Sequence, residues 1–336
     1  MFNYKLNLQL FAGQLNTNTT LDSGLSVENK TFYDMTLIDT AQPHLVHDQF
    51  GQKRPIPKNG GKKIEFRQYA SLPKALTPLT EGVTPDGSKL SVTSIEAEIS
   101  QYGNYVTLSD ILDLTAIDNN VVEATKACGR QAGLTLDTIT RNTLQACPNV
   151  WYCPTSEGTA VTSRANLTNT CKLTVKVVKK VAAFLKANNA PKIGDSYVAI
   201  IHPYAAFDLM EDPEWKYPHQ YQDTSNLYEG EIGKVAGVRF VETSEAKIFN
   251  RKEDETPKYG VFSTLFIAEG AYGVTEISGG GLQTIVKQLG SAGTGDPIDQ
   301  RSTVGWKATK VAEILVPAYM VRVESMGDFS AEAEAN

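Results

Sequence analysis

Cysteine is scarce in this chain, with four residues among 336. A small secreted domain held together by disulfides needs a much denser set, so the composition excludes a disulfide scaffold and favours a reducing cytosol. Long apolar runs are missing too, and none approaches the roughly 18 residues of a membrane-spanning helix. The apolar stretch near the N-terminus is short and is broken by Asn7 and Gln9, so it resembles a signal peptide only weakly.

Basic residues are outnumbered by acidic ones. The chain has 32 Lys and Arg against 38 Asp and Glu, a formal net charge of −6 and a pI near 5.4. A free-standing DNA-binding protein usually has a basic balance, so strong sequence-specific DNA binding is not expected. Hydrophobic residues at 41% and charged residues at 21% are ordinary for a globular chain, and the length predicts about two globular units.

Motifs for catalysis and cofactor binding are missing as well. Gly290–Gly295 is rich in glycine, but Asp296 follows where a phosphate-binding loop needs lysine and then a hydroxyl residue. His44 and His47 lack the HExxH pattern, and the cysteines lack zinc-ribbon spacing. No GxSxG sequence provides a nucleophile. We therefore expect no catalytic residue, no cofactor and no metal site.

The first unusual feature that is present is the segment 50–108. Lys63–Arg67 and Ile95–Ile99 alternate apolar and charged residues, which predicts two strands. Leu90–Val92 alternates in a different phase, which predicts a bulge near residues 93–94. About twenty residues with proline and glycine turn signals separate the two strands, and few compact domains carry so long a connection without a function for it.

This ribbon contains few large apolar residues, and a two-stranded hairpin alone is marginal in water. Its charge is divided, with seven basic residues and one acidic residue over 50–75, against one basic and four acidic over 76–99. A solvated ribbon would show this pattern. So would a protruding arm whose charges meet complementary charges on a neighbour. We therefore expect the ribbon to be disordered or to lie on another molecule.

The second unusual feature is a long helix predicted over 119–147. Apolar residues recur there every three or four positions, Asn120 and Glu123 match a capping box, and Pro148 stops the pattern. Such a helix would be a rod of roughly 40 Å. Gly129 and Gly133 weaken it by about 1 kcal/mol each, so we expect close packing against a sheet as the offset.

From residue 172 the pattern becomes α+β. Helices at 173–185 and 202–209 and strands at 197–201, 237–241 and 260–267 predict one compact domain over 172–278. Strands follow at 282–286 and 311–323, so the segments 101–150 and 282–323 must meet in one discontinuous domain. The ends differ in character: residues 1–30 are polar and predict an extended arm, and the small, acidic residues 325–336 predict a frayed tail.

This order of arm, hairpin, long helix, inserted α+β domain and returning strands resembles the major capsid protein of tailed bacteriophages, a fold shared with the herpesvirus capsid floor. Six local stretches are similar to those proteins as well: Leu8–Gly13, Thr31–Ile38, Phe50–Pro57, Leu76–Val83, Gly233–Thr243 and Gln300–Lys307. The resemblance spans nearly the whole chain, and the order of the stretches is more specific than any one of them.

The resemblance implies a fold of five parts. These are an N-terminal arm (1–45), an extended loop (50–108), a peripheral domain (109–171 plus 282–325) containing the helix 119–147, an axial domain (172–281) and a flexible tail (326–336). It also implies residues that contact neighbouring subunits, and the candidates are Lys62, Lys63, Arg67, Lys74, Lys89, Arg301 and Trp306.

The function implied by the resemblance is structural and not enzymatic. The chain would assemble with itself as pentamers and hexamers into the icosahedral shell of a virion, in the bacterial host cytoplasm, around double-stranded DNA. Its acidic charge would keep it from gripping that DNA. Many relatives carry an N-terminal scaffolding segment that this sequence does not show, so we expect a separate scaffolding protein, together with a portal and, as in some relatives, a decoration protein.

Two other classes stay open on the sequence alone. The length would accommodate an α+β enzyme with an unrecognised active site, which predicts perturbed titratable groups gathered in a pocket. A surface-layer or adhesin-type module would need a genuine signal peptide, and the broken run near Leu6 argues against one.

Overall fold

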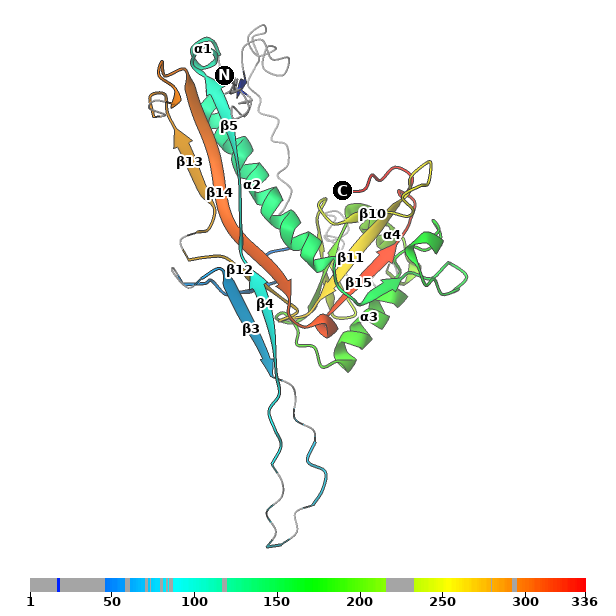
Figure 1. Cartoon of the computed structure of the whole chain (residues 1–336). Helices are drawn as coiled ribbons and strands as arrows, with labels where there is room; N and C mark the ends of the chain where they lie inside the picture. The colour runs from blue at the N-terminus through cyan, green and yellow to red at the C-terminus, as the bar shows by residue number, and fades with distance from the viewer. Residues whose placement is uncertain are drawn as a thin grey trace, which may run out of the picture. The chain divides into compact units, whose positions relative to one another are not determined.

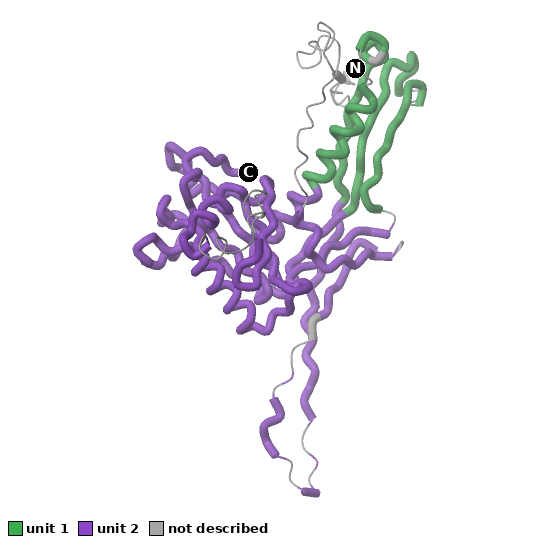
Figure 2. Tube along the Cα trace, turned by 180° about the vertical axis from the view of Figure 1, so that it is seen from behind, with its two compact units in different colours: residues 1–42, 101–135, 280–309 green, residues 43–100, 136–279, 310–336 purple. Residues whose placement is uncertain are grey.

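The computed structural model describes residues 17–18, 46–57, 61–69, 72, 74–78, 81–82, 84, 87–116, 120–215, 233–278, 280–291 and 295–336 (Figure 1). The chain forms two compact units (Figure 2). Unit 1 comprises residues 1–42, 101–135 and 280–309, and unit 2 comprises residues 43–100, 136–279 and 310–336. The predicted N-terminal arm lies almost entirely outside the described residues.

Unit 1 is a sheet with a helix packed on it. Its strands, in the order of pairing, are β1 (Thr17–Asn18), β5 (Ser100–Ser109), the first part of β14 (Arg301–Ile314) and β13 (Gln283–Lys287). The short helix α1 (Asp110–Thr115) begins at the Ser109 cap, and the long helix α2 (Asn120–Leu144) follows it. Cys128 and Ala132 of α2 are buried, and the Trp306 indole of β14 donates to the Gln131 side chain of α2 at 3.3 Å.

Glycine permits a close approach of two strands in this sheet. A Cβ atom on Gly305 of β14 would lie 2.8 Å from the Cβ of Tyr105 in β5. The prediction that Gly129 packs closely against a sheet is wrong, however, because no atom lies within 4 Å of the place that its Cβ would take. Gly129 faces solvent in the described chain, so nothing there offsets its cost to the helix.

Unit 2 contains a seven-stranded sheet. Its strands are β6 (Val150–Tyr152), β15 (Met320–Ser325), β11 (Gly260–Ile267), β7 (Tyr197–Ile201), β9 (Val238–Glu242) and β8 (Lys234–Val235), in that order, with β10 (Ile248–Asn250) also paired to β11. Every residue of β7 and β11 is buried, as expected for central strands covered on both faces. Helix α3 (Val175–Ala187) buries a valine-rich face in the same core, and α4 (Pro203–Met210) begins with proline at its first turn.

Two smaller elements complete unit 2. The strand β12 (Tyr272–Thr275) pairs in parallel with β2 (Gln52–Lys53) and antiparallel with the end of β14. The strands β3 (Lys63–Tyr69) and β4 (Val92–Glu98) form a separate hairpin with an unbroken antiparallel register. The predicted bulge near residues 93–94 is therefore wrong, because Leu90 and Ser91 precede the strand. None of the helices in the described segments is long and apolar enough to cross a membrane.

The C-terminal residues depart from the predicted arrangement. β15 pairs with β11 from Phe262 opposite Ser325 to Ile267 opposite Met320, so it joins the sheet of the 172–278 segment. The prediction of a frayed, flexible tail over 326–336 is wrong as well, since Met326 and Ser330 are fully buried. Small residues, which suggested disorder, instead permit close packing: a Cβ on Gly260 would lie 2.8 Å from Ala333.

The packed C-terminal segment makes a prediction at Gly327. A Cβ at this position would overlap an oxygen of Asp208, whose side chain is buried and paired with Lys172 at 3.3 Å. We expect Gly327→Ala to lower the free energy of unfolding by about 1–3 kcal/mol, the usual cost of overpacking. The matched control, Gly129→Ala, should raise it by about 0.5–1 kcal/mol. Urea unfolding of both variants measures this, and equal stabilities would contradict the packing of the tail.

Candidate assembly surfaces

The base of the β3–β4 hairpin is anchored on its own chain. Phe66 is 7% exposed and packs with Ala97 and Leu315 in a small apolar cluster. Gly273 of β12 provides room for this contact, since a Cβ there would lie 3.0 Å from the Phe66 ring. The prediction that the whole ribbon needs another molecule is therefore wrong for its base.

The tip of the hairpin, between β3 and β4, has the opposite character. All of its described residues are exposed. They include three leucines, Leu72 at 52%, Leu76 at 82% and Leu90 at 67% exposure. Full burial of one such side chain is worth about 1.5–3 kcal/mol, so the tip offers a neighbour an apolar contact. The three leucines are visible in the sequence, but they are few and widely spaced, and the prediction of a contact with a neighbour rested on the charges alone.

The five charged candidates in the hairpin are exposed: Lys62, Lys63, Arg67, Lys74 and Lys89. Two of them have ion pairs within the hairpin, Lys63 with Glu96 at 3.3 Å and Arg67 with Glu65 at 3.0 Å. The Arg67 hydrogen bond holds the pKa of the Glu65 carboxyl below its usual value. Exposed pairs of this kind contribute little to stability, so their charges remain able to act on a neighbour.

The two other candidates, Arg301 and Trp306, lie in unit 1 and have contacts there. The backbone N–H of Arg301 donates to Asp296 at 2.8 Å, and its guanidinium is 3.6 Å from the same carboxylate. Trp306 is only 5% exposed. Most of the Trp306 side chain is thus covered within the chain, which makes the hairpin residues the stronger candidates for contact with a neighbour.

Buried titratable groups bear on the enzyme alternative. His47 is fully buried, its Nδ1 lies 2.6 Å from an Asp137 oxygen, and its backbone N–H donates to the same carboxylate at 2.9 Å. His202 caps α4 and stacks on Phe262 with ring centroids 5.5 Å apart, and burial lowers its pKa to about 4. In the ranges that the structure describes, no three His, Cys, Asp or Glu side chains gather as a metal site would require. These histidines serve packing and capping.

Comparison with known proteins identifies the family. The model of the phage capsid protein family matches residues 101–295 of the chain. The solved capsid of cyanophage P-SCSP1u is similar at 15% identity and a TM-score of 0.69, covering 89% of this chain and 93% of that one. The capsid of Ralstonia phage GP4 is similar at 14% identity and a TM-score of 0.65, covering 93% and 98%.

A third capsid structure, from cyanophage Pam1, covers 98% of this chain and 100% of its own at 12% identity and a TM-score of 0.62. At identities this low, the similarity to these capsid structures shows a shared fold, and that fold is of the α+β class. No curated protein sequence matches the chain. Because the family model covers more than half of its length, the chain belongs to the phage capsid protein family and is a major capsid protein that forms the shell.

Proposed function

We propose that the chain assembles with itself as pentamers and hexamers into an icosahedral shell around double-stranded DNA. The observation that carries this proposal is the hairpin tip, whose described residues, three leucines among them, are all exposed. A closed shell needs many weak, repeated contacts between identical subunits, and a protruding element provides them without a catalytic site. The proposed role is therefore structural and not enzymatic.

The proposed partners follow from the same role. Assembly would take place in the bacterial host cytoplasm with a separate scaffolding protein and a portal, and with a decoration protein if the shell has one. The net charge of −6 supports non-specific proximity to packaged DNA without tight phosphate contacts. The division into an N-terminal arm, an extended loop, a peripheral domain and an axial domain stays a proposal about roles in the shell. The flexible tail is not part of it, and residues 320–325 pair with the sheet of the axial segment.

Electron microscopy of the purified, overexpressed protein tests the proposal directly. Closed shells with five-fold and six-fold capsomers are the expected result. Particles that stay monomeric at every protein concentration, with or without co-expressed scaffolding protein, would contradict it.

The basic half of the hairpin makes a second prediction. Replacing Lys62, Lys63 and Arg67 by Glu should raise the critical concentration for assembly by roughly fivefold to thirtyfold in low salt, because three exposed pairs at about 0.3–0.7 kcal/mol each sum to about 1–2 kcal/mol. The effect should shrink near 0.15 M salt, where charges are screened within about 8 Å. Light scattering across salt concentrations measures this. The control carries the same charge change at exposed positions outside the hairpin: Lys176, Lys180 and Lys252 to Glu. An equal effect in the control would refute a specific role for the hairpin charges.

A further inference from the structure

Two cysteine side chains lie in the same core of unit 2. Cys153 directly follows strand β6, and Cys171 follows the loop 154–170 that begins there. Both are 0% exposed, and both belong to one apolar cluster. Strand β7 contributes every second residue to that cluster, Tyr197, Ala199 and Ile201, so the cluster covers one face of the sheet. The two thiols are therefore buried on the same face.

The backbone places the two cysteines beside each other. Strand β6 runs parallel to β15 with Tyr152 opposite Glu324, and the Cys153 N–H continues this ladder by donating to the Glu324 carbonyl at 3.0 Å. In a parallel ladder the next bond would run from the Met326 N–H to the carbonyl of Cys153. That N–H donates instead to the carbonyl of Cys171, at 3.1 Å. Cys171 therefore stands next to Cys153 along the edge of β15.

The spacing that results suits a disulfide. Neighbouring backbones in a sheet lie about 4.8 Å apart, and the Cα atoms of a disulfide are usually about 4.4–6.8 Å apart. The electrostatics also indicate that the thiols are close, because burial raises the pKa of the Cys153 thiol and the Cys171 thiol raises it further. Both cysteines are free thiols in this structure.

The loop between the two cysteines controls access to them. The structure describes every residue from 154 to 170, and Leu167 alone among them is buried. A segment with so few buried contacts opens locally at a small free-energy cost. While the loop is closed, the raised pKa keeps Cys153 as an unreactive thiol. We therefore expect the thiols to react only when residues 154–170 open.

We propose that Cys153 and Cys171 form a disulfide within each chain when the protein meets a low-molecular-weight disulfide such as oxidised glutathione, and that they remain free thiols in a reducing compartment. Arg164 lies in the loop that this bond closes, and it donates to the buried Glu324 carboxylate at 2.6 and 2.7 Å. The bond thus fastens that ion pair as well. The inference concerns one subunit and goes beyond the assembly role, because it holds for any shell geometry.

The reaction proceeds in two exchange steps. When the loop opens, the thiolate of one cysteine attacks the sulfur–sulfur bond of oxidised glutathione and displaces one glutathione thiolate. The thiolate of the second cysteine then attacks the protein sulfur of this mixed disulfide and displaces the other. The two cysteine thiols lose two electrons and two protons in total, and one oxidised glutathione becomes two reduced molecules.

Oxidation of the full-length protein tests the proposal. The purified chain is incubated with oxidised glutathione at mildly alkaline pH, and its free thiols are counted after denaturation. We expect the count to fall from four per chain to two, with full recovery after reduction. Trypsin cuts after Arg164, between the two cysteines, so the expected product is a disulfide that joins peptide 142–164 to peptide 165–172. If all four thiols stay free, the proposal is overturned.

Serine variants provide the matched controls. Cys153→Ser and Cys171→Ser should each abolish the link between the two peptides, whereas Cys128→Ser should form it as the wild type does. Cys147 shares the peptide 142–164 with Cys153, so the Cys147→Ser variant assigns the bond and should also form it. The chain unfolded in urea is the comparison for native proximity. It should favour Cys147 with Cys153, which close the smallest loop, and the same preference in the folded chain would overturn the proposal.

Hydrogen exchange measures the effect of the bond on the loop. Backbone exchange of residues 154–170 should be at least about fivefold slower in the oxidised chain than in the reduced chain, because the closed loop loses most of its open states. Cys171→Ser after the same treatment should exchange as it does without oxidant. Equal exchange in the oxidised and reduced wild type would contradict the gating of the cysteines by this loop.

Discussion

Replacing residues 70–91 by Asn-Gly is expected to abolish shell assembly while leaving the subunit folded. The hairpin ladder ends with Tyr69 opposite Val92, and a two-residue Asn-Gly turn is the favoured way to close two such strands. The described residues that this change removes are all exposed, so none of the described core residues of unit 2 is lost. We expect the melting temperature to change by less than about 2 °C, since surface changes rarely exceed 0.5 kcal/mol.

Electron microscopy and thermal unfolding together measure this result. A same-length variant with Leu72, Leu76 and Leu90 changed to Ser separates apolar contact from length, and it should also assemble poorly. Phe66→Ala is a control for the hairpin base. It should lower the free energy of unfolding of the subunit by about 3 kcal/mol, because it removes the central side chain of the apolar cluster there. Normal shells from the shortened protein would show that the tip has no role in assembly.

The two ends of this hairpin illustrate what the sequence could reveal. The strands were predictable because Lys63–Arg67 and Ile95–Ile99 alternate with period two. The anchoring of the base was not, because Phe66 packs on Leu315, a partner some 250 residues away that no local pattern indicates. The same limit explains the tail: the small residues around Ser330 predicted disorder, while their contacts with Gly260 depend on the tertiary fold.

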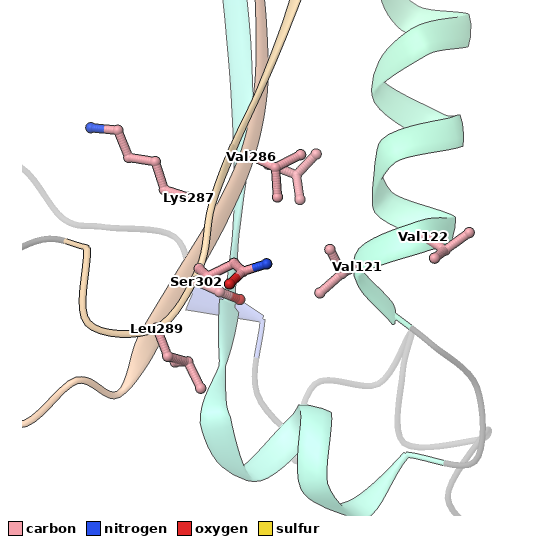
Figure 3. A pocket seen from close by; sticks show the side chains of 8 residues that line it. Val121, Val122, Val286, Lys287, Leu289 and Ser302 are labelled. Carbon is pink, nitrogen blue, oxygen red and sulfur yellow. The ribbon is translucent and has the colours of Figure 1, made fainter.

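The candidate surfaces also differ in whether a local sequence pattern reveals them. The hairpin charges could be found because they are consecutive in sequence and divided in sign. The groove between α2 and the strands β13 and β14 (Figure 3) could not be found from the sequence, because its lining residues meet only in the folded unit: 121–122, 286–289, 302 and 304. The placement of Trp306 was equally hidden, since its burial depends on Gln131 of another element.

Glu324→Ala is expected to lower the free energy of unfolding by about 3–5 kcal/mol, the largest effect of any substitution proposed for the subunit. The Glu324 side chain on β15 is fully buried and accepts two hydrogen bonds from Arg164, at 2.6 and 2.7 Å. Arg322 lies 3.1 Å from the same carboxylate, and burial lowers the pKa of its guanidinium. Removing this carboxylate therefore leaves two partly buried cations, Arg164 and Arg322, without their counter-charge, which is costly in a poorly solvated site.

The comparison that isolates burial is Glu214→Ala, which removes a carboxylate from an ion pair with Lys179 at the same 2.6 Å distance. Both side chains of that pair are more than half exposed, so we expect a loss below about 1 kcal/mol. Urea unfolding of the dissociated subunits measures the stability of both variants. The dependence of the unfolding free energy on urea concentration should stay the same in the two variants, so that only the midpoint differs. β15 is paired to β11 by the strand ladder, so the buried ion pair joins this sheet to Arg164 in the turn at residues 164–166. If the two variants lost equal stability, solvent would have to reach Glu324, and the C-terminal strand would not be part of the core.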